Sequence, residues 1–269
     1  MSDAIEAIER AALESLHDAA TAELRAQLGI QSGAAGSGFL SLASALPASA
    51  IVVNRTIGLG VETAESRDTV EAVVERYRSA GVLRYFIHLH PESRPSDMAK
   101  WLTGLGLERG RGWMKFRRGR SAPPPAETTL DIRKATAADA EAFGRIECDA
   151  FDLGPTAIPW VGRLIGCPGW HIYMSFDDGT PAGAGALFVS DEVGWCDWGA
   201  TAAGFRGRGS QSALLRRRIL DAMDLGCRLL VTTTGEEVPG DPQHSFKNIL
   251  RMGFEPAYVR QNYAPPKPS

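Results

Sequence analysis

The feature that most constrains this chain is a strand-like run, Val193–Thr201, which ends in a glycine-rich loop and passes into a helical pattern. Leu215, Ile219 and Ala222 recur at helical spacing, and Gly226 stands where a left-handed C-terminal cap is expected. The segment therefore predicts a strand, a glycine loop and a helix whose N-terminus lies at the glycines.

The loop at 206–211 reads Arg-Gly-Arg-Gly-Ser-Gln. A helix N-terminus leaves about four backbone N–H groups unpaired and carries partial positive charge, and glycines let the backbone approach a ligand closely. Arg206 and Arg208 add fixed positive charge, so the loop predicts an anion site. The first glycine of the Rossmann fingerprint and the Lys-Ser/Thr pair of a P-loop are both missing, which excludes those two nucleotide motifs.

The same loop resembles the acetyl-CoA loop of the GNAT family of N-acetyltransferases, Gln/Arg-x-x-Gly-x-Gly/Ala. Arg206 and Gly209 fit this pattern, while Gln211 replaces its final small residue. The resemblance is strong over residues 130–263 and implies acetyl-CoA as co-substrate. It also implies an acyl-CoA-dependent N-acetyltransferase that acts on a primary amine of a small molecule or a peptide.

Composition and charge narrow the class of protein. With 269 residues, 44% hydrophobic and 23% charged, the chain is expected to form two soluble domains. No apolar run approaches the roughly 20 residues that span a bilayer, and the acidic N-terminus lacks a signal-peptide pattern, so we expect a cytoplasmic protein without a membrane partner. The basic residues are scattered, which speaks against nucleic acid. The four cysteines are far apart, so no disulfide framework or metal site is expected.

The predicted elements alternate in a way that favours a mixed α/β sheet. Helices are expected over Ile5–Leu28, Arg67–Ala80, Ser96–Leu105, Ala138–Ala150, Pro155–Ile165 and Gln243–Met252, besides the helix after the glycine loop. Strands are expected over Phe39–Leu46, Ile51–Gly58, Arg84–His90, Trp113–Arg118, Leu130–Thr136, His171–Phe176, Ala182–Val189, Val193–Thr201, Arg228–Thr234 and around Pro256–Tyr263. The Gly/Ser/Ala segment Gln31–Ser37 is expected to be a loop.

The two halves repeat one order of elements, with paired glycines 25 residues apart at Gly81 and Gly106 and 27 apart at Gly226 and Gly253. In the first half, the counterpart of the glycine loop is Gly58–Glu65, which carries Glu62 and Glu65 and no arginine, and this opposes phosphate binding. We therefore expect a degenerate GNAT-like domain without a cofactor loop at 1–118. A proline-rich linker at 119–128 and a catalytic GNAT domain at 129–269 follow, each domain with a mixed, mostly antiparallel sheet flanked by helices.

The GNAT resemblance implies a set of cofactor contacts. Pantetheine is expected to pair with the end of the strand, and pyrophosphate to lie on the N–H groups of the loop. The implied residues are Thr201, Ala202, Ala203, Arg206, Gly207, Arg208, Gly209, Ser210, Gln211, Ser212 and Asn248. A β-branched side chain at Gly209 is expected to project into the space where phosphate meets the backbone.

Catalytic groups are less clearly marked. Alternation places Trp195, Asp197 and Thr201 on one face of the strand, and Asp197 stands where relatives carry a base. It could equally be an exposed strand residue or bind a cationic acceptor. Ile249 occupies the position at which many relatives place a tyrosine general acid, which leaves Tyr258 as a substitute.

The acceptor stays open between aminoglycosides, amino acids, peptides and polyamines. Asp152 and Trp160 lie in the region that covers the acceptor pocket in relatives and could shape a small-amine site. A non-catalytic acyl-CoA-binding sensor or interaction module is the alternative, and both a monomer and a homodimer are open. His88 and His90 share a strand face, but no third ligand is evident nearby.

Overall fold

Strands from the whole chain form one 12-stranded sheet in the computed structural model, which describes residues 2–240 and 243–267. They are β1 (Ile30–Ala35), β2 (Gly38–Ala43), β3 (Arg55–Ile57), β4 (Phe86–Leu89), β5 (Glu108–Arg109), β6 (Trp113–Arg118), β7 (Asp131–Lys134), β8 (Trp170–Asp177), β9 (Thr180–Ser190), β10 (Val193–Thr201), β11 (Leu229–Gly235) and β12 (Glu255–Ala264). Their order is β1-β2-β3-β4-β12-β6-β11-β10-β9-β8-β7, with β5 paired to β12. Among the described ladders only β3–β4 and β10–β11 are parallel, so the expected mixed, mostly antiparallel sheet is confirmed.

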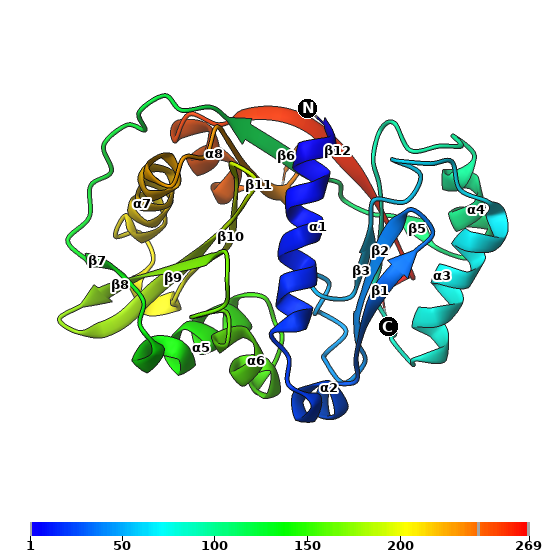
Figure 1. Ribbon diagram of the computed structural model, residues 1–269, viewed down its shortest axis with the longest axis horizontal. Coiled ribbons are helices and arrows are strands. Elements are labelled where there is room, and N and C mark those ends of the chain that lie inside the picture. Colours follow the sequence, from blue (N-terminus) through cyan, green and yellow to red (C-terminus); the bar gives the residue numbers. More distant parts are fainter. Residues whose placement is uncertain (1, 241–242, 268–269) are drawn as a thin grey trace.

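Helices flank this sheet on both faces, as the α/β class requires (Figure 1). They are α1 (Ser2–Asp18), α2 (Ala22–Leu28), α3 (Arg67–Ser79), α4 (Met98–Gly104), α5 (Ala140–Ala150), α6 (Ile158–Gly162), α7 (Ser210–Asp224) and α8 (His244–Arg251). On one face of the β8–β11 region, α7 and α8 bury their apolar stripes. On the other face, α1, α5 and α6 share a core with the same strands.

The segment Gln31–Ser37, expected to be a loop, instead forms β1 and a hairpin turn with β2. Ile30 and Ala35 are buried at the two ends of β1, and Gly36 turns the chain at φ 59°. The small residues between them have low strand propensity, so that tertiary pairing with β2 decides the conformation. That pairing is invisible to a local sequence pattern.

The centre of the sheet interleaves strands from both ends of the chain. β6, which precedes the proline-rich segment, lies between β11 and β12 and pairs with both. β12 runs beside β6 over 255–260 and then continues beside β4 and β5 over 261–264. The C-terminal half of the sheet therefore contains a strand from the N-terminal half, and the division at 118/119 stays a prediction from the sequence.

Helix α1 lies across the middle of the molecule, between the two halves of the sheet (Figure 1). Its apolar side packs on β9 and β10 as well as on β1 and β2. Two tryptophans of the C-terminal half fasten it, because Trp160 Nε1 donates to the Leu16 carbonyl at 2.8 Å and Trp170 Nε1 donates to Ser15 Oγ at 3.0 Å. The N-terminal helix thus forms one wall over the strand that precedes the glycine loop.

Candidate functional site

The site begins where β10 and β11 separate. The two strands pair in parallel as far as Cys196 and Thr232, and the Thr232 hydroxyl donates to the Cys196 carbonyl at 2.8 Å at the base of the split. Beyond this point β10 has a bulge between Asp197 and Ala200, where Trp198 takes a left-handed φ of 46°. The bulge turns β10 away from β11, which continues along β6.

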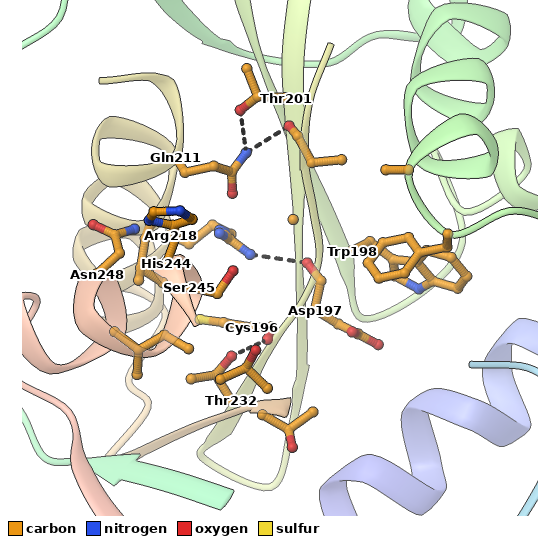
Figure 2. A pocket seen from close by; sticks show the side chains of 18 of the residues that line it. Cys196, Asp197, Trp198, Thr201, Gln211, Arg218, Thr232, His244, Ser245 and Asn248 are labelled. Atoms are coloured by element: carbon orange, nitrogen blue, oxygen red, sulfur yellow. Dashed lines mark hydrogen bonds between the residues drawn. The ribbon is translucent and has the colours of Figure 1, made fainter. Parts of the chain in front are cut away.

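Two side chains from α7 close the bulge on its β9 side. Arg218 Nη1 donates to the carbonyls of Ala186 and Asp197 at 3.1 and 3.0 Å, and Gln211 Nε2 donates to the Ala200 carbonyl at 2.6 Å (Figure 2). Arg218 is 4% exposed. These contacts bridge β10 to β9. The backbone groups on the opposite edge of β10, which faces the split, are therefore available to a ligand.

The N-terminus of α7 opens onto this split. Gly209 caps the helix in a left-handed conformation, with φ 80°. Within the described chain, the backbone N–H groups of residues 207–212 donate no hydrogen bond to another residue. Ser212 Oγ donates to Asn248 Oδ1 at 2.6 Å and so ties the start of α7 to α8. Unpaired backbone N–H groups at a helix N-terminus favour an anion, because they donate hydrogen bonds and carry partial positive charge.

The two loop arginines differ in what they contact. Arg206 is exposed, lines the cavity, and has no ion pair among the described residues. Arg208 makes a bidentate pair with Asp177, both contacts at 2.7 Å, and does not line the cavity. Its carbonyl accepts a hydrogen bond from Thr128 Oγ1 at 2.8 Å, so Arg208 fastens the loop to the protein.

Gly209 is constrained by the proline-rich segment and not by a ligand. A Cβ added there would lie 2.1 Å from the Glu127 carbonyl oxygen, whereas a Cβ at Gly207 would meet no atom within 4 Å. The expectation that a side chain at Gly209 projects into the phosphate space is wrong for this reason. Segment 119–128 packs under the loop and supports it.

A cavity of about 1090 Å³ runs through the split and reaches both faces of the sheet. On the side of α7 and α8 it is lined by Gln211, Ser212, Leu215, Arg218, His244, Ser245, Asn248 and Ile249. On the side of α1 it is lined by Glu9, Ala12, Leu13, Leu16, Val52, Arg55, Trp113, Phe151, Trp195, Asp197 and Trp198. Figure 2 shows β10 between the two sets, with Arg218 and Asn248 on one side and Trp198 on the other.

Asp197 presents its two polar groups to opposite faces. Its carbonyl accepts from Arg218, while its half-buried side chain points away from α7 and toward the side of α1 (Figure 2). The carboxylate has no hydrogen bond to a described residue, and it borders the apolar wall formed by α1, Phe151 and Trp198. A free carboxylate in a mostly apolar chamber can accept a proton from a bound amine.

Comparison with known proteins identifies the architecture. No family model matches, and no curated protein matches by sequence. Among solved structures, a GCN5-related N-acetyltransferase from Kribbella flavida is similar over 94% of this chain and 96% of its own, with TM-score 0.61 and 18% identity. A tandem GNAT protein from the clavulanic acid biosynthesis pathway is similar over 74% of this chain and 68% of its own, with TM-score 0.53 and 15% identity.

This chain has a tandem GNAT fold. A functionally unknown conserved protein from Staphylococcus epidermidis is also similar in structure, with TM-score 0.58 and 12% identity, over 88% of this chain and 94% of its own. The shared fold confirms the expected architecture, and the activity rests on the residues of the site.

Most of the residues implied by the GNAT resemblance meet at the cavity. Asp197, Thr201, Arg206, Gly207, Gly209, Ser210, Gln211, Ser212 and Asn248 line it. Ala202, Ala203, Arg208, Asp152, Trp160 and Tyr258 do not. Thr201 lies on the α7 side, where its hydroxyl accepts from Gln211 at 3.1 Å, because the bulge reverses the alternation that would have placed it beside Asp197.

Trp160 and Asp152, the two residues predicted to contact the acceptor, lie outside the cavity lining and contact other parts of the protein. Trp160 is fully buried and holds α1, and Asp152 is an exposed residue at φ 52° whose carbonyl accepts from Ser49. Phe151, beside Asp152, does line the cavity and packs edge-on against Trp198 with ring centroids 5.5 Å apart. Phe151 and α1 thus both line the cavity on this side of the sheet.

Tyr258 is engaged away from the split. Its hydroxyl donates to Glu6 Oε1 at 2.6 Å, its ring packs edge-on against His90, and burial raises its pKa above the ordinary value for tyrosine. Ile249, which the GNAT resemblance matches to a tyrosine position, lines the cavity and offers no proton.

Three charged residues of the cavity were missed by the sequence patterns. Arg218 lies in the apolar stripe of α7, three residues after Leu215, and Glu9 lies in the stripe of α1 formed by Ile8 and Ala12. A charged residue inside an apolar stripe is the signal that could have found both. Arg55 follows no pattern, since β3 has only three residues.

The N-terminal counterpart of the GNAT loop is filled by the protein itself. The Glu65 carboxylate accepts from the Ser37 N–H and hydroxyl, both at 2.6 Å, and a Cβ at Gly60 would lie 2.5 Å from the Arg94 carbonyl oxygen. Over the described residues, no group of three His, Cys, Asp or Glu side chains is arranged to hold a metal ion. Nor does any described helix have the length and apolarity to cross a membrane.

Proposed function

We propose that this protein is an N-acetyltransferase that transfers an acetyl group from acetyl-CoA to a primary amine. The observation that carries the proposal is a single cavity joining unpaired N–H groups at the start of α7 to the free carboxylate of Asp197 on the other face of the sheet. Acetyl transfer needs these two features on either side of a gap through which donor and acceptor can meet.

The residues present fit the polyanionic end of CoA. The N–H groups of residues 207–212 and the exposed guanidinium of Arg206 supply donors and positive charge for a pyrophosphate. Gly207, at φ 79° with open space around its missing Cβ, leaves room for phosphate oxygens to reach the backbone. The free edge of β10 and the Asn248 amide line the path that an amide-containing arm would follow.

Bound acetyl-CoA would supply the acetyl group as a thioester, whose carbonyl carbon accepts the amine's electron pair while the C–S bond breaks. Asp197 would take the proton that the amine nitrogen loses. The apolar wall of α1, Phe151 and Trp198 would exclude water from this carboxylate and hold the amine against the split. Trp198 and Arg218 fix the bulge and so position Asp197.

Ile249 leaves the thiolate without a dedicated acid. A thiol with a pKa of about 8.5 leaves readily as a thiolate near neutral pH and can take its proton from water, so the reaction does not require a tyrosine at this position. We expect a modest kcat, since a positioned general acid contributes on the order of a hundredfold or more.

Calorimetric titration with CoA tests the binding half of the proposal. Arg206→Ala should weaken CoA, whereas Arg228→Ala, which removes an exposed arginine of the same half outside the cavity, should not. Free-thiol release from acetyl-CoA with a panel of amines tests the chemical half. Asp197→Asn should lower kcat and leave the CoA affinity unchanged.

A non-catalytic acyl-CoA-binding module is the second candidate, and Ile249 at the acid position favours it. The two candidates differ in one result. CoA binding without thiol release for any amine on the panel would establish the module, while absence of CoA binding would overturn both.

A further inference from the structure

A cluster of five buried charged side chains lies where α1 meets the centre of the sheet. Glu9 is fully buried and accepts from Arg55 Nη1 at 2.8 Å, from Lys115 Nζ at 2.5 Å and from Arg260 Nη2 at 2.8 Å. Arg260 also pairs with Glu6 at 3.2 Å. The cluster joins α1 to β3, β6 and β12, and two of its members, Glu9 and Arg55, line the acceptor side of the cavity.

The cluster holds more positive than negative charge. Among the described residues, the ion-pair partners of Arg55, Lys115 and Arg260 are Glu6 and Glu9, and all five side chains are less than 9% exposed. With Lys115 protonated, the cluster has one positive charge in excess. Burial acts to raise the pKa of Glu9, but the three cations together hold it well below its ordinary value, so Glu9 is ionised. A buried charge without a partner is costly, and a bound anion would compensate it.

The unpaired hydrogen-bonding groups at this end of the cavity are donors. Arg55 is 5% exposed, its only hydrogen-bond partner among the described residues is Glu9 at Nη1, and its Nε has none. The Nε–Nη2 edge is the one that takes a carboxylate side-on. Trp195, fully buried and also on the cavity, has an unpaired Nε1. Donors without acceptors call for a ligand that brings oxygen lone pairs.

We propose that the acceptor is an amine that also carries one carboxylate, an amino-acid-like zwitterion, with its carboxylate on Arg55 and its amine facing Asp197. This inference rests on the proposed acetyl transfer for the role of the amine. Arg55 and Asp197, which have opposite charge, both line the chamber, and this matches a zwitterion and disfavours a polyamine. Leu13, Leu16 and Phe151 also line it and favour an apolar side chain on the acceptor.

One negative charge fits better than two. The excess in the cluster is a single positive charge when Lys115 is protonated. Burial together with Arg260 lowers the pKa of Lys115 to about 7, and a bound anion would favour its protonated form. A carboxylate therefore balances the cluster with Lys115 protonated, whereas a phosphate dianion would leave a buried negative charge. This distinguishes the carboxylate from other anions that an arginine binds.

Turnover by the full-length protein tests the acceptor class through a matched pair of substrates. With saturating acetyl-CoA, phenylalanine should exceed phenethylamine in kcat/KM by about 10- to 100-fold, the range of one charge-assisted, bidentate contact. Equal or better turnover of phenethylamine would overturn the inference and leave the acetyltransferase proposal standing.

Two variants distinguish a contact between Arg55 and the ligand from the contribution of the charged cluster to folding. Arg55→Met and Arg260→Met each remove one positive charge and bring the cluster to balance, but only Arg55 lines the cavity. Arg55→Met should reduce the preference for phenylalanine by about tenfold or more, and Arg260→Met should retain it in whatever fraction folds, as measured by circular dichroism. A similar loss in both would assign the cluster to folding alone.

A binding measurement keeps the test independent of catalysis. 3-Phenylpropionate has the carboxylate and no amine, so calorimetry with the CoA-saturated protein should show binding that Arg55→Met weakens. Such binding without acetyl transfer to any amine would support the anion site and refute the proposed function. No binding of 3-phenylpropionate, or tighter binding of phenethylphosphonate, would refute the carboxylate assignment.

Discussion

Alanine substitutions at Gly207 and Gly209 form a matched pair that tests how the cofactor loop is supported. Both glycines have left-handed backbones, with φ 79° and 80°. An L-residue in that conformation costs roughly 1–2 kcal/mol, so both variants should lose about this much unfolding free energy. Gly209→Ala alone also drives a Cβ to 2.1 Å from the Glu127 carbonyl oxygen, and overpacking of this kind adds about 1–3 kcal/mol.

Urea unfolding followed by circular dichroism measures the difference. We expect Gly207→Ala to lose about 1–2 kcal/mol and Gly209→Ala about 2–5 kcal/mol, with unchanged m values. CoA titration then asks whether the weaker loop still binds. If the two variants lose equal stability, segment 119–128 does not pack against Gly209 and the account of the loop's support fails.

Three further outcomes follow from the structure. Arg206→Ala should raise the calorimetric Kd for CoA roughly three- to tenfold, because it removes one exposed, charge-assisted contact and leaves the helix N–H groups in place. Asp139→Asn should cost about 1 kcal/mol of unfolding free energy at pH 7. Hydrogen bonds from Arg133 hold the pKa of Asp139 well below 3.8, so the stability that the carboxylate adds is present above that pH and is lost as the pH falls through and below it. The unfolding free energies of the two proteins should therefore converge on acid titration. Lys115, with its pKa lowered to about 7, binds fewer protons when folded than when unfolded between pH 7 and its ordinary 10.5, so stability should rise across that window and Lys115→Met should flatten the rise.

Local sequence patterns predicted where the glycine loop at 206–211 lies between a strand and a helix. β6 and β10 span the predicted residues Trp113–Arg118 and Val193–Thr201, since each carries aromatic residues and is flanked by polar or turn residues. The bulge at Trp198 could not be foreseen, because it involves Arg218, which lies 20 residues after Trp198 in α7 and donates to carbonyls of both β9 and β10. That bulge moved Thr201 to the other face of the strand.

The side of the cavity lined by α1 depends on contacts between segments that are distant in the sequence, and a local sequence pattern does not reveal such contacts. Glu9 lines the same cavity as Asp197 because α1 crosses the sheet, and Trp160 and Trp170 hold α1 in that position. Trp160 was expected in the pocket because it lies in the region that covers the acceptor pocket in GNAT relatives. Its indole N–H instead donates to the Leu16 carbonyl, and the side chain is fully buried against α1.

The order in which the chain is made has a consequence for β12. Residues 255–264 leave the ribosome after the other described strands of the sheet, yet β12 is the strand that lies between β4 and β6. Until it arrives, β4 and β6 each expose an edge that can pair with a neighbouring chain. The two halves can therefore complete one sheet only after residues 255–264 have been made, and a nascent chain stopped before residue 255 would be prone to aggregation on those edges.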